Sequence, residues 1–465
     1  MKNKLFISIY CGLMILLASC NNYLDVKPKG KIIPKTAEDF STIIHYWLDQ
    51  IEKGRDDVII PNPEVMTTLE MFADDLNATL ASNFGYTSIY VGSAINKNQA
   101  TYKTLYSVIK DCNMVIGNMD DTESDLARTL LGTAWSIRSI CYYNLMQRYC
   151  EPYQPETAKE TLGLPLVDDF DMEAKPARAN LKETAEFIEE GFQKALSYNV
   201  SNEDFIFTSS VTKAYFARFF FWTQNWSNAI TYAKEVLEKY PMLEADEYVE
   251  AINQKQAKAH NVIIRSFTMD DDIGTMSYAT AQADIKSRPV DRNLVDLFAA
   301  TDNDVRRRCN YDSKRIVNKI ITTKFRSEEL CLIIAEAHAH LNQETDALGY
   351  LNQLRSKRIT QDYIAYTIDN LPEVFQQNIK TDATGIPLTK LMSAILCERR
   401  KELFVEGDRW FELKRNGRPE FWVAAKGKKF ITEKYLYTFP IPKADIRLFP
   451  DRSEEHTSEL QSLFR

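Results

Sequence analysis

Residues 210–241 read SVTKAYFARFFFWTQNWSNAITYAKEVLEKYP. Two apolar helical segments flank a short polar turn at Gln224 and Asn225. Small residues at Ala217 and Ala229 lie twelve positions apart, and a proline follows twelve positions after Ala229. Because small side chains let two antiparallel helices approach closely and proline ends a helix, this pattern predicts a tight helical hairpin.

A second stretch, residues 328–357, repeats this pattern with Ala335 and Ala347, again twelve positions apart. Both stretches resemble the tetratricopeptide repeat, a unit of two antiparallel helices. The second departs from it at His338, where the repeat prefers an aromatic residue. Since Ala229 and Ala347 are 118 residues apart, the two units are not a simple tandem array. The alternative is a pair of ordinary helical hairpins.

Helical periodicity extends along most of the chain. The predicted helices cover residues 36–50, 101–119, 124–150 and 180–197, and a helix–turn–helix covers 388–416 with Gly407 at its turn. Residues 261–267 predict a short strand, 54–63, 151–178 and 269–288 predict loops, 359–387 a loop or weak helix, and 66–99 a mixed segment. The expected fold class is mostly α. Tetratricopeptide-like hairpins form the scaffold, and long loops with a few short strands carry the ligand surface.

The composition argues against a nucleic-acid-binding protein and against a disordered chain. The net charge is −8, which argues against a nucleic-acid-binding protein, because such proteins usually carry a basic face. Hydrophobic residues make up 45% and charged residues 26%, so the chain is expected to fold rather than to stay disordered. Aromatic residues, 11% of the chain, suit both a large core and a surface that binds apolar ligand faces.

The first twenty residues read MKNKLFISIYCGLMILLASC. A basic start precedes an apolar stretch that is shorter than the ~20 residues needed to span a bilayer. This pattern predicts a secretory signal peptide over residues 1–19, with an N-terminal membrane anchor helix as the alternative. The sequence Leu17-Ala18-Ser19-Cys20 resembles the bacterial lipobox, in which the cysteine becomes the first mature residue and carries acyl chains.

We therefore expect Cys20 to be lipidated, residues 20–35 to form the lipidated start and a polar tether, and residues 36–450 to form a single helical domain. No other run of ~18 apolar residues is found, so the chain is expected to be anchored to a membrane without spanning it. No CxxC pair is present. Free, buried thiols are favoured over disulfides for the six remaining cysteines, which are Cys112, Cys141, Cys150, Cys309, Cys331 and Cys397.

Three separated motifs resemble one family. Residues 20–30 (CNNYLDVKPKG) are similar to the mature start of SusD/RagB-type lipoproteins of Bacteroidetes. Residues 398–415 (ERRKELFVEGDRWFELKR) are similar to the C-terminal hallmark of that family, and residues 435–446 (YLYTFPIPKADI) to the segment that follows it. The resemblance covers nearly the whole chain, from Cys20 to about Pro450, and the repeat-like hairpins fit it.

The resemblance implies a nutrient-binding lipoprotein on the outer face of the outer membrane. Such proteins bind glycans, and sometimes peptides, and act as a lid on a SusC-type TonB-dependent transporter barrel. They bind and deliver their ligand without cleaving it. Two alternatives stay open, a peptide-binding or purely structural helical-repeat adaptor at the cell surface and an exported hydrolase.

In the hallmark segment, acidic and basic residues alternate. This arrangement suits helix-surface ion pairs and a buried charged seam between two helices, so we expect a structural role for it. The motif residues are Glu398, Arg399, Arg400, Glu402, Leu403, Glu406, Gly407, Arg409, Trp410, Leu413 and Arg415.

Signals for catalysis or metal binding are weak. The sequence has no GxSxG, HExxH, glycine-rich phosphate loop or EF-hand pattern, and no cofactor besides the lipid on Cys20 is expected. His338 and His340 are two positions apart, so a helix points them to different sides and they cannot share a metal ion. Residues 270–272, three aspartates, are able to help hold Ca²⁺, but a solvated loop is favoured there.

Ligand binding has a clearer physical basis. The C–H faces of sugar rings pack on aromatic rings, and their hydroxyls need amide and carboxylate partners. Two stretches, 74–90 and 269–288, combine such side chains on expected loops. The candidate residues are Asp74, Asp75, Asn77, Asn83, Phe84, Tyr86, Tyr90, Tyr278, Gln282 and Arg288. The alternative is that the aromatic residues of the first stretch belong to the core or to ordinary loops.

The end of the chain differs from the rest. Residues 452–462 read RSEEHTSELQS and resemble the translation of a common sequencing adapter. We expect residues 452–465 to be a non-native tail and leave them out of the fold prediction. The closing segment that the family pattern has after Ile446 is not found, so the natural C-terminus is expected to differ.

Overall fold

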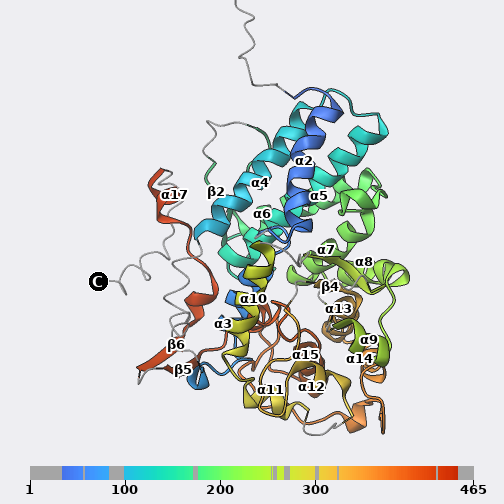
Figure 1. The fold of residues 1–465 in the computed structure, drawn as a ribbon, viewed down its shortest axis with the longest axis vertical. Helices are drawn as coiled ribbons and strands as arrows, with labels where there is room; N and C mark the ends of the chain where they lie inside the picture. Colours follow the sequence, from blue (N-terminus) through green and yellow to red (C-terminus); the bar gives the residue numbers. More distant parts are fainter. Residues whose placement is uncertain are drawn as a thin grey trace, which may run out of the picture.

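The computed structural model describes residues 34–448 except 56–57, 83–98, 171–175, 253, 255–258, 267–272, 299–302, 322–323 and 426–427. The fold is mostly helical, as predicted (Figure 1). The α-helices are α2 (Ala37–Glu52), α3 (Pro63–Phe72), α4 (Gln99–Asn118), α5 (Asp125–Tyr149), α6 (Leu181–Ser197), α7 (Ser209–Trp222), α8 (Trp226–Lys239), α9 (Ala245–Ile252), α10 (Ile273–Lys286), α11 (Arg292–Asp296), α12 (Val305–Asn310), α13 (Ser327–His340), α14 (Glu344–Ser356), α15 (Lys390–Glu402), α16 (Arg409–Arg415) and α17 (Lys443–Leu448). The 3-10 helices are η1 (Ala78–Leu80), η4 (Glu203–Phe205), η5 (Ile368–Asn370) and η6 (Lys434–Tyr437).

Three antiparallel strand pairs accompany the helices. They are β1 (Leu162–Pro165) with β2 (Arg178–Asn180), β3 (Val262–Arg265) with β4 (Lys324–Arg326), and β5 (Phe421–Ala425) with β6 (Lys428–Thr432). The predicted strand over residues 261–267 is confirmed as β3. The other strands were not predicted, because such short pairs give little periodic signal.

Both predicted hairpins are present, and they are built alike. Ala217 and Ala229 are fully buried between α7 and α8, where Phe220 stacks on Tyr232 with ring centroids 5.7 Å apart and an interplanar angle of 17°. The corresponding pair in α13 and α14 is His338 on Tyr350, at 5.9 Å and 15°. The imidazole ring of His338 therefore takes the place of the aromatic ring that the repeat prefers.

The two hairpins lie next to each other in space, although they are far apart in sequence. Helix α8 packs against α13, so the order α7, α8, α13, α14 forms one continuous layer, which α15 extends. On the other side, α6 packs against α7, and α4, α5 and α6 form the N-terminal part of the scaffold (Figure 1). A stack of helical hairpins thus carries the rest of the chain.

Several helix starts are capped by polar side chains. Thr36 and Asn180 form capping boxes with Asp39 and Glu183, and Ser124 accepts a hydrogen bond from the backbone N–H of Ala127. Such caps satisfy backbone donors that a helix leaves unpaired in its first turn. These starts agree with the sequence prediction to within a residue or two.

The largest core cluster joins the two ends of the described chain, from Ala37 to Ile441. Within this cluster, Trp410 contacts residues from both ends of the chain: its ring stacks on that of Tyr437 with centroids 4.5 Å apart, and its centroid lies 5.4 Å from that of Phe72.

The six cysteines from Cys112 to Cys397 are free thiols, and all but the half-buried Cys397 are buried, in agreement with the prediction.

One predicted loop is wrong. Residues 273–286 form helix α10, which packs against α3. Tyr278, Ala281 and Ile285 are buried and recur at helical spacing, and the alanines of this stretch favour a helix. The three aspartates before it and its own polar residues explain why the stretch was predicted as a loop.

Candidate functional site

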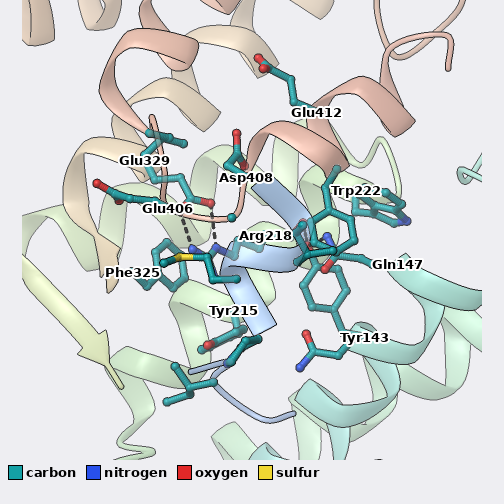
Figure 2. Close-up of a pocket in the computed structure, with 18 of the residues that line it drawn as sticks. Tyr143, Gln147, Tyr215, Arg218, Trp222, Phe325, Glu329, Glu406, Asp408 and Glu412 are labelled. Carbon is teal, nitrogen blue, oxygen red and sulfur yellow. Dashed lines mark hydrogen bonds and ion pairs between the residues drawn. The ribbon is translucent and has the colours of Figure 1, made fainter. Parts of the chain in front are cut away.

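A pocket opens where the first hairpin meets the hallmark segment (Figure 2). Its walls come from helices α3, α5, α7, α13, α15 and α16, from strands β3 and β4, and from the segment before α3. Its cavity volume is about 120 Å³. At 10–15 Å³ for each enclosed water, this gives room for on the order of ten water-sized groups, which is the size of one sugar ring.

Aromatic side chains form much of the pocket wall. Phe221 and Trp222 come from α7, Phe411 from α16, and Tyr143 and Tyr215 from α5 and α7. The rings of Trp222 and Phe411 meet edge to face with centroids 6.4 Å apart. Phe411 is half-buried, so part of its ring is accessible. Such rings offer flat apolar faces on which the C–H face of a sugar can pack.

Charged side chains sit beside these rings in fixed positions. Arg218 donates to Glu329 through Nε to Oε1 at 2.7 Å and Nη2 to Oε2 at 2.5 Å, as the dashed lines in Figure 2 show. Arg399 donates to Asp408 in the same two-point manner, at 2.9 and 2.6 Å. The side chains of Arg218 and Asp408 are 23% and 20% exposed, whereas the other charged residues of the wall are nearly buried, so these two mark the mouth.

Four buried polar atoms of the lining residues have no hydrogen-bond partner within the described residues. They are Trp222 Nε1, Arg399 Nη1 and Arg415 Nη2, which are donors, and Glu412 Oε1. Burial raises the pKa of Glu412 to about 7. A buried polar atom without a partner costs about 1–3 kcal/mol, and because these four atoms are shielded from solvent, this cost belongs to the fold of the wall and not to its accessible surface.

The hallmark residues next to the pocket form a buried network of ion pairs. At its centre, Glu402 accepts hydrogen bonds from Arg306, Arg326 and Arg358 and is fully buried. These three arginines come from α12, β4 and the end of α14. The seam therefore joins several parts of the fold rather than only α15 and α16.

The other charged residues of the motif are also paired. Glu398 pairs with Arg306 and Lys401, Arg399 with Asp408, Arg400 with Asp75, Glu406 with Arg326 and Lys319, Arg409 with Asp74 and Glu412, and Arg415 with Glu336. Leu403, Trp410 and Leu413 are buried, and Gly407 has a φ of +80° at the turn.

The charges in this network are stabilised by their partners. Burial by itself raises the pKa of Glu398, but Lys401 and Arg306 outweigh it and hold that pKa at about 2. The pKa of Glu402 is held below its usual range, because its three arginines outweigh burial. Breaking such a buried pair typically costs about 3–5 kcal/mol, so these residues hold the walls of the pocket in place.

Several residues predicted to bind ligand are instead committed to the fold. Asp75 is fully buried and pairs with Arg400 at 2.6 Å, and Asp74 pairs with Arg409. Arg288 is 1% exposed and donates to the backbone carbonyl of Met71. For these three the prediction of ligand contact is corrected, because their charged groups lie inside the protein and already have partners.

The remaining described candidates also bond within the protein. Asn77 donates to Asp291 at 3.0 Å, Tyr278 donates to Gln282 at 3.1 Å, and Gln282 also accepts from the backbone N–H of Ile321. The two stretches that contain them lie side by side: the N–H groups of Asn77 and Ser82 donate to the carbonyls of Pro289 and Ser287.

Some predicted residues lie outside the described residues. These are Cys20, Asn83, Phe84, Tyr86, Tyr90, the three aspartates at 270–272, the signal segment 1–19 and the tail 452–465. Within the part of the chain that is described, no group of three or more His, Cys, Asp or Glu residues is placed to hold a metal ion.

Sequence reasoning missed the pocket. Its residues come from six helices, two strands and loops, and no single local pattern links them. Two signals were available: the hallmark segment, which was assigned a structural role, and the aromatic run Phe219-Phe220-Phe221-Trp222 at the end of α7, which is longer than core packing of one helix face requires.

Two family models match parts of the sequence, and several solved structures match the fold. A model described as the SusD family matches residues 309–452, and one described as starch-binding, associating with outer membrane, matches residues 22–221. No curated protein matches the chain significantly.

Three solved structures illustrate the similarity. A SusD superfamily protein from Bacteroides fragilis is 19% identical, with 91% of this chain and 100% of that chain covered and a TM-score of 0.68. A SusD-like carbohydrate binding protein from Bacteroides vulgatus ATCC 8482 is 18% identical, with 90% and 97% covered and a TM-score of 0.66. A laminarin binding SusD-like protein is 15% identical, with 89% and 98% covered and a TM-score of 0.57.

Proposed function

Because the chain belongs to the SusD/RagB family, we propose that it captures a glycan at the cell surface and delivers it to a SusC-like TonB-dependent outer membrane transporter. The observation that carries the glycan part is the pocket of Figure 2, where aromatic rings lie beside the accessible charged side chains of Arg218 and Asp408. A sugar ring needs both: an apolar face for its C–H groups and hydrogen bonds for its hydroxyls.

The relatives support the same ligand class. The family model over residues 22–221 describes starch binding, and two of the similar structures are described as carbohydrate binding and laminarin binding. We take the glycan as the ligand on these grounds. Asn83, Phe84, Tyr86 and Tyr90 remain proposed contacts for the polymer.

The proposed location is the outer membrane, with the protein facing outward and held by a lipid on Cys20. In the part of the chain that the structure describes, no helix is long and apolar enough to cross a membrane. More than one acyl chain is needed for stable attachment, and the lipobox-like Leu17-Ala18-Ser19-Cys20 is the feature that predicts it. We propose that residues 36–450 act as one binding domain behind the tether.

The protein is proposed to bind its ligand without cleaving it. The test is to electrophorese the purified protein in gels that contain single polysaccharides, and to incubate it with the same polysaccharides and with peptides. Retardation by at least one neutral or acidic glycan, without release of products, is the expected result. Binding of peptides alone would favour the peptide-binding adaptor, and product formation would favour a hydrolase.

Delivery to a transporter needs a separate measurement. Co-purification of the lipidated protein with a TonB-dependent barrel from native membranes is expected. Isolation of the protein without any such barrel, under conditions in which other outer membrane complexes survive, would contradict this part of the proposal.

A further inference from the structure

A second hollow, which shares no lining residue with the first pocket, lies between residues 303–318 and residues 359–361, around α12. Its volume of about 560 Å³ falls in the range of about 300–1,000 Å³ that is typical of ligand sites. Its wall includes Asn303, Arg307, Arg308, Arg315, Asn318 and Thr360. Guanidinium, amide and hydroxyl groups thus line the same groove.

The groove is firmly built. Asp304 forms a β-bridge with Ile359, and the N–H of Thr360 donates to the carbonyl of Asn303, so its two sides are joined by backbone hydrogen bonds. On the other side, a β-bridge between Tyr311 and Val317 closes a turn. The groove therefore keeps its shape without a ligand.

The arginine in this turn is in an unusual position. Arg315 has a φ of +65°, a left-handed conformation that glycine or asparagine adopts at lower cost. Its Nη1 donates to the carbonyl of Val290 at 3.1 Å, which fixes the guanidinium at the groove. Backbone strain of this kind is often found at functional sites, and here it places a cation.

The accessible charge at the groove is positive, although the whole chain carries −8. Arg307, Arg308 and the neighbouring Lys314 are exposed. Of the two acids in the wall, Asp304 is fully buried and paired with Arg306, and Asp312 accepts the N–H groups of Lys314 and Ile316. Asp296, on α11 near Tyr311, is the opposing exposed acid. Positive charge prevails at the rim.

We propose that this groove binds anionic groups on sugars, sulfate or carboxylate, so that the captured glycan is an acidic polysaccharide. The inference rests on the proposed function, because it names the class of glycan. Arginine forks suit sulfate and carboxylate oxygens. The amide nitrogens of Asn303 and Asn318 and the hydroxyl of Thr360 already donate to backbone carbonyls, at 3.5, 3.4 and 3.3 Å, and their oxygens are able to accept from sugar hydroxyls. The groove is large enough for more than one sugar unit, unlike the pocket in Figure 2.

The test compares dextran with dextran sulfate, which share one backbone and differ in the anionic group. Purified full-length protein is run in gels that contain either polymer. The variant Arg307→Glu/Arg308→Glu is compared with Lys103→Glu/Lys194→Glu, which changes the net charge equally at exposed positions on α4 and α6. Circular dichroism and thermal melting check that both variants are folded, and Arg308→Gln serves as a milder single change.

The wild type and the lysine variant are expected to be retarded by dextran sulfate and not by dextran. The arginine variant should bind dextran sulfate about tenfold or more weakly, because charged hydrogen bonds are lost and like charges face the ligand. The retardation should fade between about 0.05 and 0.5 M salt, where the screening length falls below the groove dimensions.

Two results would overturn the inference: equal retardation by both polymers, or equal loss in both charge variants, which would mean that overall charge alone attracts the polymer. If neutral glycans from the panel bind while sulfate makes no difference, the proposed function stands and only the acidic class fails. If no glycan of any kind binds, the proposed function itself fails.

Discussion

Arg409 and Asp74, 335 positions apart in the chain, form a two-point ion pair, with Nε 2.7 Å from Oδ1 and Nη2 3.0 Å from Oδ2. Asp74 follows α3, and Arg409 begins α16, so this pair fastens the N-terminal third of the chain to the hallmark segment. Burial raises the pKa of Asp74, but Arg409 and Arg400 outweigh it and hold that pKa below its usual range. The carboxylate of Asp74 is therefore ionised, and its charge is paired with that of Arg409.

Arg409→Ala should lower the free energy of unfolding by about 3–5 kcal/mol, because it leaves Asp74 and Glu412 buried without their cation. Chemical denaturation followed by circular dichroism measures this change. Lys103→Ala, an exposed change on α4, is the control and should stay within about 0.5 kcal/mol of the wild type. An Arg409 variant with unchanged stability and lost glycan binding would show that the residue acts on the ligand instead.

Glu70 predicts a pH dependence of stability. It is 1% exposed, its Oε1 accepts the N–H of Gly407 at 2.7 Å, and burial, with Asp75 adding to it, raises its pKa from 4.5 to about 8. Between these two values the folded protein keeps a proton that the unfolded chain has released. Glu70 therefore lowers the free energy of unfolding as the pH rises from about 4.5 to about 8.

Glu70→Gln removes this titration and keeps an acceptor for Gly407. The variant should be more stable than the wild type at pH 8, by at least about 1 kcal/mol, and the difference should shrink towards pH 5. Urea denaturation at both pH values measures it. Glu64→Gln, an exposed change on the same helix, is the matched control. A constant difference between the two pH values would contradict the assignment.

The ring of Phe411 should contribute to glycan binding. Phe411→Leu keeps an apolar side chain but loses the flat face, which is worth about 0.5–1.5 kcal/mol. We expect glycan affinity to fall about two- to tenfold with little change in the melting temperature, measured by calorimetry on a glycan identified in the gel screen. Phe187→Leu, a half-buried ring on α6 outside the pocket, should leave affinity unchanged. Equal affinities in all three proteins would remove the pocket from the binding site.

Cys20→Ala should abolish lipid attachment. Without the acylated cysteine, the protein is expected to stay uncleaved at this site and to appear as precursor or as soluble periplasmic protein, since membrane retention depends on the buried acyl chains. Metabolic labelling with an alkyne fatty acid detects the difference directly. Equal label on wild type and variant would disprove the anchor. The Cys11→Ala change, inside the predicted signal, is the control and should keep the label.

The predicted helices were found because each carries its own signal. Thr36, Ser124 and Asn180 cap helices: each side chain accepts a hydrogen bond from a backbone N–H three residues further along the chain. The small residues Ala217 and Ala229 lie on facing helices of one hairpin. Such interactions are local, so spacing alone exposes them. Helix α10 was missed because the aspartates before it and its polar residues resemble a loop, and the strand pairs because they are short.

The binding residues were harder to predict for a physical reason. Asp74 and Asp75 look like exposed loop carboxylates, and nothing within their own stretch shows that Arg409 and Arg400 will bury them. The groove around Arg307 and Arg308 likewise depends on residues 359–361, which fold back from beyond α14. The sequence around an acidic residue does not show which basic residue will pair with it in the folded protein.

The amino-acid sequence alone was enough for the helical class, both hairpins and the family resemblance, because helix periodicity, capping and contiguous motifs act over short distances along the chain, and the lipid anchor that it also predicts stays a prediction. Three-dimensional packing settled which polar groups are buried partners, such as Asp74 with Arg409, and which stay accessible, such as Arg308. The physical reason is that burial and ion pairing depend on contacts between residues far apart in the chain, 335 positions for Asp74 and Arg409, and these contacts exist only once the helices have packed.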